Sequence, residues 1–279
     1  MKKNKKLIAS LLLGLATLLW GLSYTIQSIT ADNLGTYTIV FFKAVGAIFL
    51  IPLIIIKKCR FNKESIIGGL VIGLCAFVGC ILQQKGMMLS SVSKASFITV
   101  LYIVIVPIIS FFLGNKIKKK MIIAIILALI GLYFLCISSS FSLNIGDFYL
   151  ILCSLCFSLQ IIFIDYYSKK ADPLSLTLTS QLSTALFSGI IMMFVEKPDI
   201  ASIKSVILPI IYIVLMSGLI AQSIQITYQK DLDPSLASLI MSFESVFGAI
   251  FGWLILGQTL TIKEIIGCIL LFIAILIAE

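Results

Sequence analysis

Long apolar runs separated by short polar joints fill almost the whole chain. We expect ten of them, over residues 7–30, 35–56, 65–84, 94–113, 121–138, 147–166, 174–195, 206–226, 235–256 and 262–278. A helix that crosses the hydrocarbon core of a bilayer, roughly 30 Å thick, needs about 20 mostly apolar residues. The pattern therefore predicts an all-α integral membrane protein with ten transmembrane helices.

Composition agrees with this pattern. The chain of 279 residues is 60% hydrophobic and only 12% charged, with a mean hydropathy of +1.17. A soluble protein of this length would need far more polar surface to cover its core. The first apolar run continues through Trp20 without a small-residue cleavage site, so we interpret it as a retained helix rather than a signal peptide. We therefore expect one membrane domain.

Basic residues gather in every second joint. If the N-terminus lies in the cytoplasm, the cytoplasmic joints hold the basic clusters at 2–6, 57–63, 116–120 and 169–170. Lys and Arg accumulate in cytoplasmic loops. We therefore expect a multi-pass protein of the cell membrane with both termini cytoplasmic, and the composition, rich in lysine and isoleucine, favours a bacterial source. The net charge of +9 sits in these joints and carries a single arginine, Arg60, which argues against nucleic acid as a partner.

The two halves of the chain end in similar segments. Ala95-Ser96 aligns with Ala237-Ser238, and Gly114 aligns with Gly257 after a slip of one residue. Because five helices per half is an odd number, the second copy must insert upside down, and inverted repeats of this kind are typical of secondary transporters. We expect residues 1–140 to form the first five-helix repeat and residues 141–279 the second, with the polar segment 138–142 between them.

Three segments carry a resemblance to a known family. They are Leu19-Trp20-Gly21-Leu22-Ser23-Tyr24 in the first helix, Lys94-Ala95-Ser96-Phe97-Ile98-Thr99 with Tyr102 and Pro107 in the fourth, and Phe243-Glu244-Ser245-Val246-Phe247 running to Gly257 in the ninth. In this order and spacing, the chain resembles the EamA-type ten-helix permeases of the drug/metabolite transporter (DMT) superfamily. The resemblance covers essentially the whole chain. It implies two EamA-like repeats and transport of amino acids, other small metabolites or nucleotide sugars.

The chain departs from that family at three positions. Lys43 stands where an arginine is frequent, Ser245 where a proline often follows the glutamate, and Gln258 where a glutamate is frequent. These departures leave the expected fold unchanged, and they weaken any transfer of a particular substrate.

Glu244 is the one carboxylate near the middle of an expected span, about ten residues into the ninth helix. Placing a charge at the bilayer centre costs about 2.5–3.5 kcal/mol on insertion scales, and burial favours the protonated form. Glu244 either binds a proton or a cationic group in a central cavity, or packs as a neutral acid hydrogen-bonded to another helix. The sequence leaves both alternatives open.

Other polar side chains mark helix faces that cannot all point toward lipid. Lys43, in the second helix, either snorkels outward, binds a substrate carboxylate or pairs with an acidic side chain. The residues that we expect to bind substrate are Trp20, Tyr24, Gln27, Lys43, Gln83, Tyr102, Gln222 and Glu244. Further polar stripes, each either interhelical packing or cavity lining, are Ser154, Ser158 and Asp165 in the sixth helix and Thr177, Ser180, Thr184 and Ser188 in the seventh.

These features predict a secondary transporter of small metabolites, amino acids or related compounds, working by alternating access, with export one possible direction. The partners are a small-molecule substrate and the lipid bilayer, and proton coupling is an open possibility. The sequence does not indicate an oligomeric state, a coupling ion or a substrate. The alternatives are a non-transporting membrane scaffold or receptor and, fitting less well, an intramembrane enzyme.

We expect no enzymatic activity, metal or cofactor. Histidine is absent, which removes the commonest metal ligand and any HExxH motif. Cys153 and Cys156 have CxxC spacing, but they lie in an apolar run without a second pair, so they read as small buried side chains. No P-loop sequence is present to drive transport with ATP.

Overall fold

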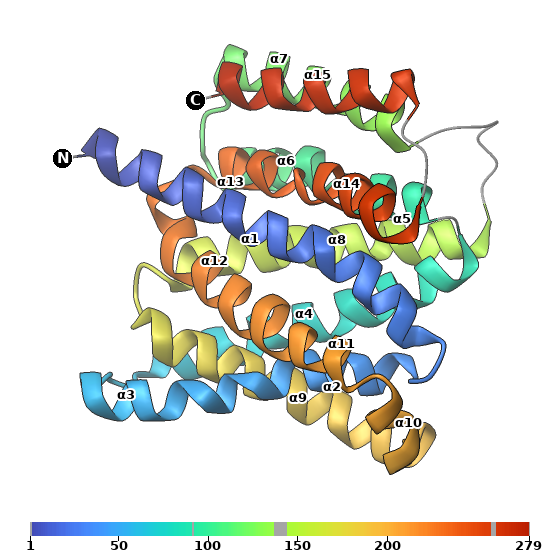
Figure 1. The fold of residues 1–279 in the computed structure, drawn as a ribbon. Coiled ribbons are helices and arrows are strands. Elements are labelled where there is room, and N and C mark those ends of the chain that lie inside the picture. The colour runs from blue at the N-terminus through green and yellow to red at the C-terminus, as the bar shows by residue number, and fades with distance from the viewer. Residues whose placement is uncertain (1, 91, 137–143, 258–260, 279) are drawn as a thin grey trace.

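The computed structural model describes residues 2–90, 92–136, 144–257 and 261–278, and this part of the chain contains helices and no strands. The helices form a layered bundle (Figure 1). In chain order they are α1 (Lys2–Ala31), α2 (Thr36–Val45), η1 (Gly46–Leu50), α3 (Ile51–Lys57), α4 (Lys63–Leu89), α5 (Val92–Thr99), α6 (Tyr102–Phe112), α7 (Lys119–Cys136), α8 (Ile145–Tyr167), α9 (Pro173–Val195), α10 (Ile200–Ser205), α11 (Ile207–Tyr212), η2 (Ile213–Ala221), α12 (Gln222–Tyr228), η3 (Gln229–Asp231), α13 (Pro234–Met241), α14 (Glu244–Leu256) and α15 (Ile262–Ala278).

Eight helices or helix runs in the described part are long and apolar enough to cross a membrane. Large apolar side chains on their outer faces, such as Phe112 and Phe194, are exposed, as contact with lipid requires. The expected all-α membrane architecture is therefore confirmed. The expected spans 121–138 and 262–278 correspond to α7 and α15, which are not among the eight. These two helices pack against each other and cover the layer that holds α5, α13 and α14 (Figure 1).

Two of the runs are broken near their middles. A turn at Val100–Leu101 separates α5 from α6, and a turn at Ser242–Phe243 separates α13 from α14. The expectation that Glu244 lies ten residues into a continuous helix is wrong, because Glu244 is the first residue of a new one. Pro107 lies inside α6, after the first break rather than at it.

Short polar sequences fix where several helices begin and end. Asp233 accepts a hydrogen bond from the Ser235 amide, and Pro234 occupies the first turn. These two residues set where α13 begins. Gly114 and Gly257 have left-handed backbone, with φ of 91° and 66°, and end α6 and α14.

The expected end of the third span at Gln83–Gln84 is wrong. Helix α4 continues to Leu89, so both amide side chains lie inside it and are buried. Of the other positions that the sequence singled out, the segment 138–142, Gln258 and the side chain of Lys94 lie outside the described residues.

Glycines bring helices into close contact where α4 crosses α9 and where α7 crosses α15. A Cβ at Gly69 or Gly73 would collide with Thr179 or Ser183 of α9, so this glycine pair allows the close packing of the two helices. A Cβ at Gly267 of α15 would meet the Gly131 carbonyl of α7 at 2.5 Å, which explains how those two helices pair so closely.

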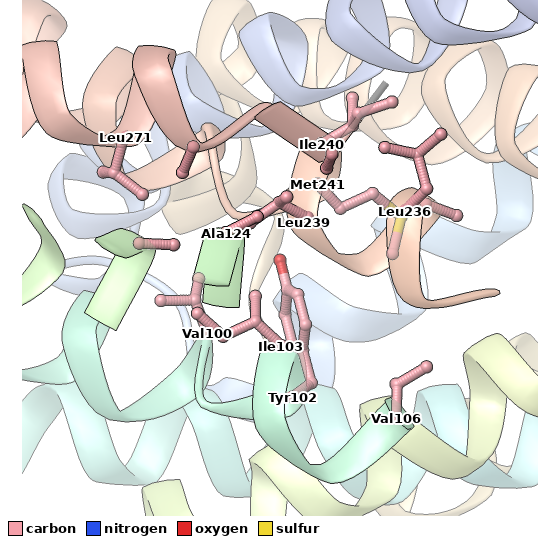
Figure 2. Packing of buried hydrophobic residues seen from close by; sticks show 14 of the residues in the cluster. Val100, Tyr102, Ile103, Val106, Ala124, Leu236, Leu239, Ile240, Met241 and Leu271 are labelled. Carbon is pink, nitrogen blue, oxygen red and sulfur yellow. The ribbon is translucent and has the colours of Figure 1, made fainter. Parts of the chain in front are cut away.

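The largest hydrophobic cluster lies where the two broken runs meet. Figure 2 shows Tyr102 of α6 reaching toward Leu239 and Met241 of α13, with Ile103 beside it. The cluster thus holds residues of the two breaks next to each other. Helix α1 begins and α15 ends at the end of the bundle where α3 lies, and α10 lies at the opposite end (Figure 1).

Candidate functional site

A cavity of about 80 Å³ lies inside the bundle. Helices α1, α2, α4, α6, α8, α9, α12, α13 and α14 contribute to its wall, whereas no described residue of α7 or α15 does. The structure brings all eight residues singled out from the sequence to this one cavity: Trp20, Tyr24, Gln27, Lys43, Gln83, Tyr102, Gln222 and Glu244. The space suits a few waters or a small solute, since one water needs about 10–15 Å³.

Glu244 is the centre of a hydrogen-bonded chain that crosses the cavity. The Tyr102 hydroxyl donates to Glu244 Oε1 at 3.0 Å, and the Tyr24 hydroxyl lies beside the same carboxylate. Gln83 Nε2 donates to the Tyr24 hydroxyl oxygen at 2.8 Å, which leaves the Tyr24 hydrogen free to point at Glu244. Side chains of α1, α4 and α6 therefore converge on one carboxylate of α14.

The backbone around Glu244 also favours a negative charge. Glu244 occupies the first turn of the 13-residue helix α14, where the unpaired amides carry partial positive charge. Gly21 of α1 packs against the Glu244 carbonyl and the Gly248 amide, and a Cβ at Gly21 would come within 2.9 Å of each. The close contact therefore depends on Gly21, whereas a Cβ at Gly248 would meet only ordinary neighbours.

Lys43 lies in the cavity wall rather than at the membrane surface. Its Nζ donates to Cys80 Sγ at 3.9 Å, a weak interaction for an ammonium group. Among the described residues, Lys43 and Glu244 form no salt bridge with each other, although both line the same space. The cavity thus offers one positive and one negative group that a bound zwitterion can bridge.

Glutamines make up much of the remaining wall. Six of them line the cavity: Gln27, Gln83, Gln160, Gln181, Gln222 and Gln225. Gln27 Nε2 donates to the Ser23 carbonyl at 3.2 Å, and Gln181 Nε2 donates to the Gly218 carbonyl at 2.7 Å. Because a carbonyl oxygen only accepts, these bonds fix the amide orientation, and each Oε1 remains an acceptor for a solute.

Segment η2 is a nine-residue π-helix that supplies acceptors to the wall. The Ser217 carbonyl accepts from Trp20 Nε1 at 3.1 Å, and Gly218 accepts from Gln181. A Cβ at Gly218 would collide with the backbone carbonyl of Lys43, so this glycine lets α2 approach η2. Such π segments are rare and occur frequently at functional sites.

Most residues of the polar stripes noted in the sequence do not line the cavity. In α9, Thr177, Ser180 and Ser188 donate to carbonyls of their own helix, and Thr184 alone of that stripe lines the cavity. Asp165 of α8 pairs with Lys169 at 2.7 Å rather than facing the cavity. Gln160 and Gln181 also line the cavity, although they were not among the residues expected to bind substrate. An amide side chain in the interior of an apolar run is the feature of the sequence that indicates such a position.

Comparison with known proteins gives three findings. The profile of the EamA-like transporter family matches residues 7–137 and again residues 144–278. A protein of Archaeoglobus fulgidus, named an uncharacterized transporter, is 30% identical over 280 residues, which cover 99% of this chain and 87% of the relative. A protein of known crystal structure superposes with a TM-score of 0.81 over 97% of this chain and 96% of its own, at 16% identity, so the two share a fold.

Two native cysteines test whether the cavity is wet. Cys80 lines the cavity, whereas Cys153 of the neighbouring helix α8 is fully buried. We expect a small water-soluble thiol reagent to modify Cys80 and to leave Cys153 unmodified in the folded protein, measured on the two peptides by mass spectrometry. Equal protection of both thiols would mean that the cavity is packed and dry.

Proposed function

This chain belongs to the EamA-like transporter family, and on that premise we propose that it is a secondary transporter that moves small polar metabolites through the central cavity by alternating access. The observation that carries the proposal is the Glu244 site. Burying a carboxylate in a membrane-spanning bundle costs free energy, and such residues mark functional sites. Family and relative point away from an enzyme.

We propose ten membrane spans in two inverted repeats of residues 1–140 and 141–279, with α7 and α15 as the fifth and tenth spans. The two separate matches to one family profile support this division. So do the paired breaks: the alignment of Ala95 with Ala237 places Tyr102 opposite Glu244, and each is the first residue after its break. The Tyr102–Glu244 hydrogen bond then joins equivalent positions of the two repeats.

The substrates that the site suits best are amino acids or related zwitterions, with export the direction to test first. In this proposal Glu244 binds the ammonium group, and Lys43 binds the carboxylate. Trp20, Tyr24, Gln27, Gln83, Tyr102 and Gln222 complete the substrate-binding wall. Aromatic rings next to Glu244 add cation–π attraction for an ammonium group, which is worth about 0.5–2 kcal/mol.

We propose that the end of the bundle holding α3 and the two chain ends faces the cytoplasm of a cell membrane. The basic residue Lys57 ends α3 at that end and Lys58 and Arg60 follow it, as the positive-inside rule requires. A reporter enzyme that is active only outside the membrane should stay inactive when fused after residue 279. Activity of that reporter would reverse the orientation.

Replacing Glu244 by Gln separates a coupling role from a structural one. Gln keeps the size and hydrogen bonding of Glu244 but cannot release a proton. If proton binding at Glu244 drives the conformational change, flux into proteoliposomes should vary with pH in the wild type and lose that dependence in Glu244→Gln. Glu264→Gln is the matched control, because this glutamate caps the first turn of α15, outside the cavity.

The rival account of Glu244 predicts a different pattern. If the side chain is only a packed neutral acid, Glu244→Gln should transport with the pH profile of the wild type, and Glu244→Ala should lower the unfolding temperature. A non-transporting scaffold or receptor predicts no flux in any variant, including the wild type.

A further inference from the structure

Helix α2 takes its N-terminal cap from a distant helix. Its own N-cap residue is Gly35, which has no side chain to accept the first amides. Glu196, at the end of α9, accepts from the Tyr37 amide at 2.9 Å and from the Thr38 amide and hydroxyl at 2.7 Å each. A Cβ at Gly35 would collide with the Glu196 carboxylate, so the glycine makes room for it.

These bonds tie a helix of the first half of the chain to a helix of the second half at one end of the bundle. Hydrogen bonds to a charged group are roughly twice as strong as neutral ones, and the first turn of α2 adds its partial positive charge. The contact involves no residue of the central cavity, so its removal leaves the Glu244 site chemically intact.

The run of α2, η1 and α3 also lies beside α9 at its other end, but the contacts there are different. Helix α9 is about 34 Å long, so its start lies at the opposite face of the bundle, next to the end of α3. There α9 is capped by its own Asp172, which accepts from the amides of Leu174 and Ser175. There the Cys59 thiol lies against the Asp172 carboxylate, and an open pocket of about 480 Å³ lies beside Lys57, Cys59 and Asp172.

The pocket and the central cavity lie against the same helix, α12. Ser223 and Ile224 of α12 line the pocket, and Gln222 and Gln225 of α12 line the cavity. The two helix runs also end alike, because Lys58 after α3 and Lys197 after α9 both have left-handed backbone, with φ of 50° and 44°. The end of α9 is therefore held by three hydrogen bonds to Glu196, whereas the end of α3 borders an open pocket.

We propose that Glu196 is the latch of a gate at one end of the transport path, and that the described conformation is closed at this end and open at the Lys57 end. In the alternate conformation the Glu196 contacts break, and Lys57 closes the opposite pocket by pairing with Asp172. Among the described residues these two groups line the pocket without an ion pair, so the pairing is available to the second state. This inference rests on alternating access.

The native thiol of Cys59 reports on the open pocket. Breaking the latch destabilises only the conformation closed at the Glu196 end, so it shifts the population toward closure of the Lys57 end. We expect Glu196→Gln to slow alkylation of Cys59 by N-ethylmaleimide by about twofold or more in the full chain in lipid nanodiscs. The rate is followed on the Cys59 peptide by mass spectrometry, which leaves the other cysteines in place.

Glu264→Gln is again the matched control. Glu264 also accepts from a backbone amide and a threonine hydroxyl, but both belong to Thr261 in its own helix. Thr38→Val removes one of the three latch donors at similar volume, and should slow the same reaction to a smaller extent even if Glu196→Gln does not fold. Slowing in the latch variants and not in the control supports the latch.

An unchanged or faster Cys59 reaction in folded latch variants would overturn the inference. Because alkylation requires neither solute nor flux, its result is independent of the transport assay. A protein that transports without the Cys59 effect would keep the proposed function and lose the latch. A protein that shows the Cys59 effect but no flux would keep a two-state gate and lose the transporter.

Discussion

The need to hold a carboxylate inside a membrane-spanning bundle organises this structure. Lipid offers no hydrogen bonds, so every polar group at this depth must find partners within the protein or in an internal aqueous space. Glu244 finds them in Tyr102 and in Tyr24 backed by Gln83, and the partial positive charge at the start of α14 adds to them. Each partner requires its own structural device: a helix that restarts at Glu244, a glycine at position 21 and a wall of amide side chains.

In the proposed alternating-access mechanism, the same devices allow the protein to change shape. The breaks before Tyr102 and Glu244 leave half-helices that are free to tilt separately in this mechanism. The carbonyls of the π segment η2 accept hydrogen bonds from the cavity side chains Trp20 and Gln181. Glycine crossings at Gly69 and Gly73 keep α4 and α9 together as a unit. In the proposed mechanism, the helices move at places held by polar contacts that can break and reform. These places are Glu196 and the surroundings of Lys57.

The sequence predicted the membrane class and the cavity residues well for a physical reason. Polar side chains are rare in apolar runs, so Glu244, Lys43 and Gln222 stand out, and the fold brings them together. Periodicity alone did not reveal the breaks at Val100–Leu101 and Ser242–Phe243, because both turns keep an apolar helical pattern on either side. The role of Glu196 was also hidden, since a glutamate at the end of a span reads as a solvated charge until the uncapped helix beside it is seen.

The central claim is that solute occupies the Glu244 cavity during transport, and protection of Cys80 tests it most directly. The rate of Cys80 modification should fall as a transported solute is added, with half-protection near the concentration that half-saturates flux. The native chain suffices, because Cys80 donates no bond to Glu244 and yet lines the same space. A Cys80 rate that stays constant at solute concentrations that saturate flux would contradict the account, because the solute would then cross the membrane by another route.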